Sequence, residues 1–160
     1  MKIPIVNEQD EIIRYKDRET RDLKEICRIT GLWLTDFEGN VLLAQRAFAK
    51  KHSPGLWGPA VSGTVEEGET YESNVIKEAE EEIGLTGLKP VLGPKIRRST
   101  NHECFAQWFT AVVDHNYPFV KRDEEVEEIK WFTREEILKL LEEKPEMFLI
   151  DFKRYKFFLE

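Results

Sequence analysis

The chain has 160 residues, of which 41% are apolar and 34% are charged, and its formal net charge is −7. This length and composition predict one folded domain spanning 1–160 and exclude a disordered chain. The acidic balance argues against general binding to nucleic acid, because contact with a phosphate backbone requires a basic protein surface.

Sequence signals for membrane insertion, export and cysteine chemistry are weak. No apolar run approaches the roughly 20 residues needed to cross a bilayer, and the first residues form no secretory signal. Cys27 and Cys104 do not stand in a Cys-x-x-Cys pair, so we expect two buried thiols rather than a metal or redox framework. A cytoplasmic protein without membrane contact is therefore expected.

The first 46 residues predict strands. Residues 1–25 indicate an N-terminal hairpin or edge extension, with strands over 3–6 and 11–15 followed by a charged turn that carries no recognisable chemistry. Residues 26–35 and 41–46 are rich in strand formers and flank a turn containing Gly and Asn. They predict an antiparallel pair at the centre of a sheet.

The loop that follows, rich in Pro and Gly, concentrates positive charge. Arg46, Lys50 and Lys51 lie within six residues of one another in a chain that is otherwise acidic. Such cations can hold phosphate oxygens, so these three residues are candidate substrate-binding residues. Solvent-exposed surface charge is the alternative interpretation of the same cluster.

A short strand over 60–63 and then an amphipathic helix are expected next. Between Thr70 and Ile83 there is no Pro or Gly, and apolar residues recur every four positions. Thr70 is placed to cap the start of the helix, and Gly84 to end it.

Three acidic residues lie beside the apolar stripe of this helix. Glu78, Glu81 and Glu82 stand at i, i+3 and i+4, which places their carboxylates close together. Crowding of like charges should raise at least one carboxyl pKa unless a cation compensates, and Mg²⁺ or Mn²⁺ prefers such oxygen ligands. A solvated acidic helix face is the alternative.

Strands and two helices are predicted for the remainder. Strands are expected over 88–98, where prolines interrupt the pattern, over 104–114 and over 126–132. A helix should span 133–142, with a capping box formed by Thr133 and Glu136. A C-terminal helix is expected within 144–160, where residues 145–158 carry an aromatic stripe suited to core packing. The stripe consists of Phe148, Phe152, Tyr155 and Leu159.

The segment from Gly63 to Leu85 carries a family resemblance. Gly63, Glu69 and the run from Lys77 to Leu85 are spaced as in the Nudix box, Gly-x5-Glu-x7-Arg-Glu-apolar-x-Glu-Glu-x-Gly-apolar. The chain thus resembles the Nudix hydrolase superfamily (MutT-like), except that Lys77 stands where the family has Arg. The pattern from Gln45 to Trp57 is similar to the branch that includes isopentenyl-diphosphate isomerase. The resemblance covers roughly 26–143 and implies an α/β (α+β) Nudix fold, with a mixed β-sheet sandwiched between helices.

The resemblance also implies an activity. It is Mg²⁺-dependent hydrolysis of a pyrophosphate bond in a nucleoside diphosphate-linked compound or a nucleoside di- or triphosphate. The expected binding partner is then a small nucleotide or diphosphate, and Mn²⁺ is a second candidate ion. The sequence does not decide whether the protein forms a homodimer.

Residue roles carried over from the family fall on the box and on two loops. The metal ligands would be Glu78, Glu82 and the Ser62 carbonyl, and Glu81 would either complete the metal shell or take a catalytic part through water. Arg46 and Lys50 would hold the phosphate, Glu125 would act as the general base, and Lys77 would orient the glutamates.

The sequence leaves two other functions open. Proton transposition on isopentenyl diphosphate would use a cysteine and two histidines where this chain has Ser62, Cys27 and Thr64, although Glu103 lies near a glutamate of the isomerase. A non-catalytic nucleotide-binding module with a Nudix shell is supported only by Lys77.

Overall fold

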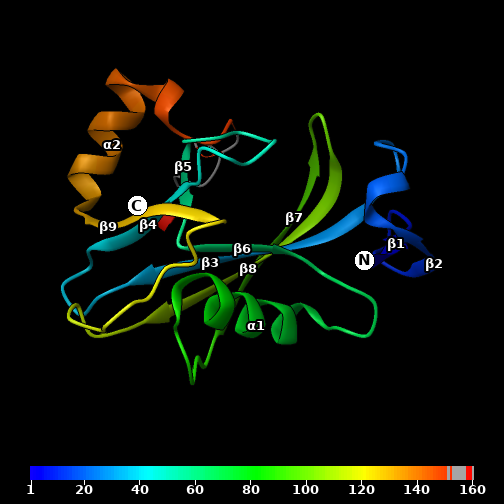
Figure 1. Cartoon of the computed structure of the whole chain (residues 1–160), viewed down its shortest axis with the longest axis horizontal. Helices are drawn as coiled ribbons and strands as arrows, with labels where there is room; N and C mark the ends of the chain where they lie inside the picture. The colour runs from blue at the N-terminus through cyan, green and yellow to red at the C-terminus, as the bar shows by residue number, and fades with distance from the viewer. Residues whose placement is uncertain (151, 153–157, 160) are drawn as a thin grey trace.

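The computed structural model describes residues 1–150, 152, 158 and 159 (Figure 1). Within that part of the chain lie β-strands, two α-helices and short 3₁₀ turns. In chain order they are β1 (Lys2–Val6), β2 (Ile12–Asp17), η1 (Arg18–Thr20), β3 (Cys27–Thr35), β4 (Val41–Arg46), β5 (Trp57–Pro59), β6 (Val61–Thr64), α1 (Tyr71–Ile83), β7 (Val91–Ser99), β8 (Glu103–Val112), β9 (Val126–Phe132), α2 (Arg134–Glu143) and η2 (Pro145–Met147).

The main sheet is mixed and has β3 at its centre, as predicted. Its strand order is β5-β4-β3-β8-β7, with β6 also paired to β3 and β9 to β4. β3 and β8 run parallel, whereas β3 and β4 form the predicted antiparallel pair. The predicted interruption before residue 98 corresponds to a register shift in β7 between Leu92 and Lys95.

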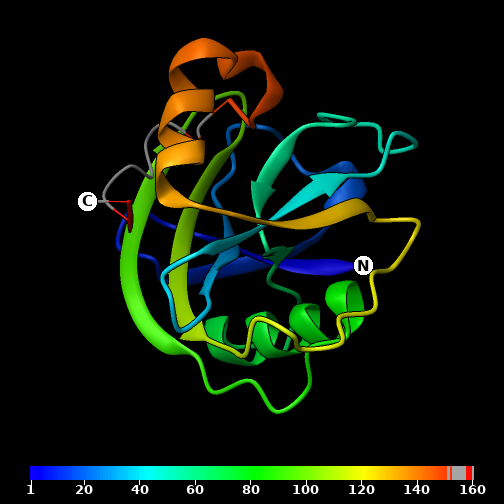
Figure 2. The ribbon, with the colours of Figure 1, turned by 90° about the vertical axis from the view of Figure 1, so that its left-hand side faces the viewer.

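Helices cover the two faces of this sheet, which confirms the predicted fold (Figure 2). Side chains alternate along β3, so neighbouring residues enter different cores. Leu32 and Leu34 pack with the apolar stripe of α1, whereas Trp33 packs with Ile137 and Leu141 of α2. No helix among the described residues is long and apolar enough to span a membrane.

The predicted C-terminal helix is wrong over its first residues. Pro145–Met147 form one 3₁₀ turn, and Phe148 is extended and bridges to Trp57. Pro145 separates this turn from α2, because proline disfavours helical conformation in the residue before it. After the turn, Phe148 pairs with Trp57 at the edge of the sheet, and this tertiary contact replaces the expected helix. Phe148, Phe152 and Leu159 are nevertheless buried together, as the aromatic stripe predicted. Tyr155 lies outside the described residues.

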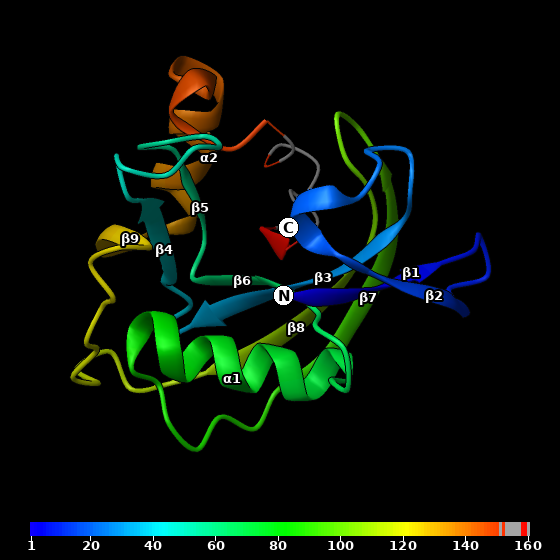
Figure 3. The same ribbon diagram turned by 45° about the vertical axis from the view of Figure 1, so that its right-hand side comes forward.

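The predicted N-terminal hairpin is present, and a buried ion network holds it against the rest of the fold. Asp10, in its turn, accepts hydrogen bonds from Arg28 Nε (2.8 Å), Tyr71 Oη (2.9 Å) and Lys95 Nζ (2.7 Å). Burial raises the Asp10 pKa, but these hydrogen bonds lower it further, so the pKa lies below its usual value. The hairpin is thus tied both to α1 and to the main sheet. Figure 3 shows the N-terminus beside β6 and above α1.

Candidate active site

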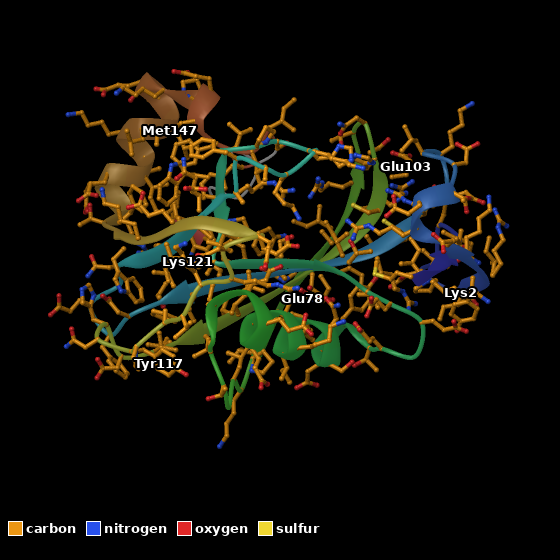
Figure 4. The ribbon with its side chains drawn as sticks, in the orientation of Figure 1. Lys2, Glu78, Glu103, Tyr117, Lys121 and Met147 are labelled. Carbon is orange, nitrogen blue, oxygen red and sulfur yellow. The ribbon has the colours of Figure 1, made fainter. Side chains whose placement is uncertain are left out.

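A cavity of about 360 Å³ lies where α1 and β6 meet the N-terminal hairpin and two loops. Glu78, Glu81 and Glu82 of α1 line it together with Arg46 and Lys50 from the loop after β4. Ser62 and Gly63 of β6, and Arg122 and Glu125 from the loop before β9, complete much of the lining. Figure 4 shows Glu78 where α1 faces β6. The fold therefore brings opposite charges from distant parts of the sequence into one hollow.

Both ends of α1 form as the sequence predicted. Thr70 is the N-cap, and its hydroxyl accepts a hydrogen bond from the Ser73 amide (3.0 Å) while Ser73 Oγ accepts one from the Thr70 amide (2.9 Å). Gly84 ends the helix with φ at +68°, a conformation that side chains with a Cβ disfavour. Fixed ends hold the acidic residues in register with β6.

The backbone of β6 passes so close to the Glu78 and Asn74 side chains of α1 that a Cβ at position 63 would displace them. A Cβ there would lie 2.9 Å from Glu78 Cδ and 3.0 Å from Asn74 Oδ1, and closer still to Glu78 Cγ. Gly63 therefore allows the Glu78 side chain to lie across the strand. This contact explains why the signature needs glycine at its first position.

Glu78 and Glu82 form a coupled carboxyl pair. Burial raises the pKa of Glu82, and its neighbour Glu78 raises it further, to about 9. The pKa of Glu78 is raised mainly by burial too, although Lys77 opposes the shift. The contact between the two carboxyl groups contributes to the raised pKa of Glu82 and lowers that of Glu78. The crowding expected from the i, i+4 spacing thus occurs between these two residues.

Lys77 ties the loop before α1 to the acidic pair. Its Nζ lies 2.7 Å from Glu66 Oε2 and 3.7 Å from Glu78 Oε1, and it also pairs with Glu69. These carboxylates raise the Lys77 pKa despite partial burial. The other Glu69 oxygen accepts a hydrogen bond from Asn74 Nδ2 (2.7 Å). Glu69 therefore acts as a tether for Lys77 and does not itself line the cavity.

Two of the three predicted cations line the cavity. Lys50 forms an ion pair with Glu125, the predicted general base. Burial lowers the pKa of Arg46, although the carboxylates of Glu125 and Glu82 oppose that shift. Lys51 is exposed and lies outside the cavity lining, so its predicted substrate contact has no support from this geometry.

Two arginines that were not predicted from the sequence, Arg18 and Arg122, line the cavity. Arg122 donates its backbone N–H to the Glu82 carbonyl (2.8 Å), and Val120 donates to the Ile83 carbonyl (3.0 Å), so this loop caps the end of α1. Arg18 comes from η1, in the segment interpreted as a turn without chemistry. Neither arginine stands in a recognisable motif. Only the docking of the hairpin and the loop reveals them.

The donor set suits a divalent cation. Glu78 and Glu82 present hard oxygen donors within hydrogen-bonding reach of each other, and their raised pKa values show that the pair favours a positive partner. Glu81 lines the same cavity but is more exposed. Across the described residues, no three acidic, histidine or cysteine side chains converge as a complete metal site. The residues thus fit a cation held by the carboxyl pair together with other oxygen donors.

Carboxylates and cations that share one hollow define a class of protein. Such a site can hold a phosphate anhydride through its cations while its acidic residues hold a metal ion and handle protons, so the fold and the site are those of a phosphoanhydride hydrolase. The NUDIX domain family model matches residues 26–152. The chain therefore belongs to the Nudix hydrolases, enzymes that act on pyrophosphate bonds in small nucleotides and generally use divalent metal ions.

The chain is similar to individual relatives of different activities and to a solved structure with the same fold. A Nudix hydrolase of Yersinia pestis is 30% identical over 138 residues, which cover 84% of this chain and 74% of that protein. An isopentenyl-diphosphate Delta-isomerase of Cereibacter sphaeroides is 29% identical over 116 residues, covering 68% of this chain and 65% of that protein. The crystal structure of DR0079 from Deinococcus radiodurans superposes with a TM-score of 0.78 at 22% identity and covers 90% of both chains.

Proposed function

We propose that this protein uses Mg²⁺ to hydrolyse the pyrophosphate bond of a nucleoside diphosphate-linked compound or of a nucleoside di- or triphosphate. The observation that carries the proposal is the shared cavity, in which Arg46 and Lys50 face the acidic residues of α1. Cations without the carboxylates would only bind an anion. Carboxylates without the cations would repel a substrate of the same charge.

Glu78 and Glu82 would hold the ion, with Glu81 and the Ser62 carbonyl as further oxygen donors. A bound Mg²⁺ offsets the charge that develops on phosphate oxygens and makes water easier to deprotonate. Both carboxyl groups would have to be deprotonated to serve as ligands of the ion. Mn²⁺ would suit the same donors.

The Lys50–Glu125 ion pair suggests how binding prepares the base. A phosphate that enters the cavity competes with Glu125 for the Lys50 ammonium, because it carries more negative charge than a carboxylate. Once released from Lys50, the Glu125 carboxylate is free to accept a proton from the attacking water. Arg46 meanwhile holds phosphate oxygens, since its Nε is fixed by the His52 carbonyl at 3.0 Å.

Lys77 performs the orienting role that the family gives to arginine. An ammonium lacks the planar fork of a guanidinium, yet this one contacts Glu66 and Glu69 and stands near Glu78. The tether is therefore intact with lysine. This geometry favours catalysis over a binding module that has lost its activity.

Isomerase activity receives no support from the geometry. Glu103, the residue nearest to an isomerase acid, begins β8 and pairs with Arg97 at 3.0 Å. It does not line the cavity. Cys27 is buried, and burial raises its pKa, so its thiol is poorly placed to exchange a proton with substrate.

The test is Glu82→Gln, with Glu80→Gln as the matched control. Both residues lie on α1, but Glu80 is exposed and does not line the cavity. Release of phosphate from a panel of nucleotides would be measured with and without Mg²⁺. We expect Glu82→Gln to lower the metal-dependent rate by at least about 100-fold and Glu80→Gln to leave it unchanged. Full activity in a folded Glu82→Gln variant would refute the proposed role.

A further inference from the structure

A group of basic residues continues beyond the cavity toward the tip of the β7–β8 hairpin. Arg18 lines the cavity itself. Arg21 follows three residues later, and its guanidinium Nη2 lies 3.3 Å from His102 Nδ1. The His102 and His52 rings then meet edge to face at 5.9 Å. Three elements that are distant in sequence thus contribute to one basic surface, here called the basic extension: Arg18, Arg21, His52 and His102.

The basic extension carries positive charge that nearby acids do not neutralise. Among the described residues, no carboxylate lies within ion-pair distance of Arg18 or Arg21. Arg14 and Lys16, on the strand just before Arg18, are both paired with Glu25. In a chain with a net charge of −7, uncompensated arginines beside an active site favour an anionic ligand.

His102 can contribute a hydrogen-bond donor to such a ligand. A guanidinium only donates, so Nδ1 of His102 must accept from Arg21, which leaves the hydrogen on Nε2. Burial lowers the His102 pKa, and the neighbouring Arg21 and His52 lower it further, which favours the neutral ring. The basic extension therefore combines two charged hydrogen-bond donors, Arg18 and Arg21, with one neutral donor, His102.

The fold holds Arg18 in place. Its backbone N–H donates to the Met1 carbonyl (2.9 Å), and Met1 also lines the cavity. The hairpin before Arg18 is fixed by the ion network around Asp10. A cation placed in advance loses less conformational freedom when it binds an anion.

We propose that Arg18, Arg21 and His102 form a second anion subsite, which holds a phosphate group of the substrate beyond the anhydride that is cleaved. The inference rests on the proposed function, because it places the cleaved anhydride between Arg46, Lys50 and the α1 glutamates. The extra phosphate has two chemical sources. It is either a further phosphate of the same chain or a phosphate carried by the second group of the substrate.

Matched ligand pairs test the subsite by equilibrium binding. One pair is ADP and ATP, which differ in chain length; the other is ADP-ribose and ADP-ribose 2′-phosphate, which differ by one remote phosphate. Dissociation constants would be measured by calorimetry with Ca²⁺ in place of Mg²⁺, and the ligand would be checked for integrity afterwards. The proteins are the wild type, the double variant Arg18→Ala/Arg21→Ala, and Arg14→Ala as a control from the same hairpin. Thermal unfolding would check the fold of each variant.

The wild type should bind the ligand with the extra phosphate more tightly in at least one pair. The double variant should lose roughly threefold to tenfold of that advantage, measured as the ratio of its two dissociation constants within one ligand pair. Arg14→Ala should keep the advantage. The responding pair identifies the source of the phosphate.

Three results would overturn the subsite: no advantage in the wild type, an advantage that survives in the double variant, or an equal loss in Arg14→Ala. Hydrolysis is measured separately. If arginine-dependent binding is intact but Mg²⁺-dependent hydrolysis is absent, the proposed function is refuted and the subsite is not. Hydrolysis without arginine-dependent binding would refute only the subsite.

Discussion

Replacing Gly63 by alanine should separate catalysis from stability. The added Cβ would lie 2.9 Å from Glu78 Cδ and closer to Glu78 Cγ, whereas ordinary contacts begin at 3.4 Å. Glu78 or the helix beneath it must therefore move by about 1 Å, a displacement that can lower a catalysed rate roughly 100-fold. Overpacking of this kind costs roughly 1–3 kcal/mol in the free energy of unfolding.

Gly68→Ala is the matched control for this substitution. It adds the same methyl group in the same segment, but its Cβ meets nothing within 4 Å, and its φ of +86° costs about 1–2 kcal/mol. The two variants should lose similar thermal stability, while only Gly63→Ala loses metal-dependent kcat/KM. Equal kcat/KM for the two folded variants would show that the position of Glu78 does not limit the reaction.

Two further predictions concern the tether and the carboxyl pair. Lys77→Met should lower kcat/KM about 10- to 100-fold in the phosphate-release assay, because it frees Glu69. Lys77→Arg should retain activity, because a guanidinium can bridge the same carboxylates. Full activity in the methionine variant would contradict the tether. The second prediction is that added Mg²⁺ raises Tm more at pH 9 than at pH 6. The pKa of Glu82 rises on folding from 4.5 to about 9, so the metal-free fold binds more protons than the unfolded chain and loses stability as pH rises across that range. Mg²⁺ can replace the proton, and an equal Tm increase at both pH values, measured by thermal unfolding, would refute the coupling.

The sequence predicted most of the fold because local patterns determined its elements. The apolar stripe of α1, together with its cap at Thr70 and its stop at Gly84, acts within one segment, and the structure reproduces all three. The first part of the predicted C-terminal helix failed because a tertiary contact overrode its local pattern. Phe148 is extended and bridges to Trp57, a pairing that the aromatic spacing could not reveal.

The candidate site was only partly predictable because much of it comes from docking between distant segments. The spacing of Glu78 and Glu82 along one helix was enough to expect a coupled pair. No spacing could place Arg18 opposite that helix, since its position depends on the contacts of Asp10 with Arg28, Tyr71 and Lys95.

Net charge gave only a coarse guide to the ligand, because the chain separates its charges in space. Glu25 neutralises Arg14 and Lys16 on the hairpin, whereas Arg18, a few residues later, faces the cavity. At physiological salt the Debye length is about 8 Å, so an anion in the cavity responds to the cations around it more than to the overall charge of −7. An acidic protein can therefore bind a polyanion where its fold places arginines together. Small phosphate compounds that fit within this one basic region are therefore the ligands that the proposed subsite predicts.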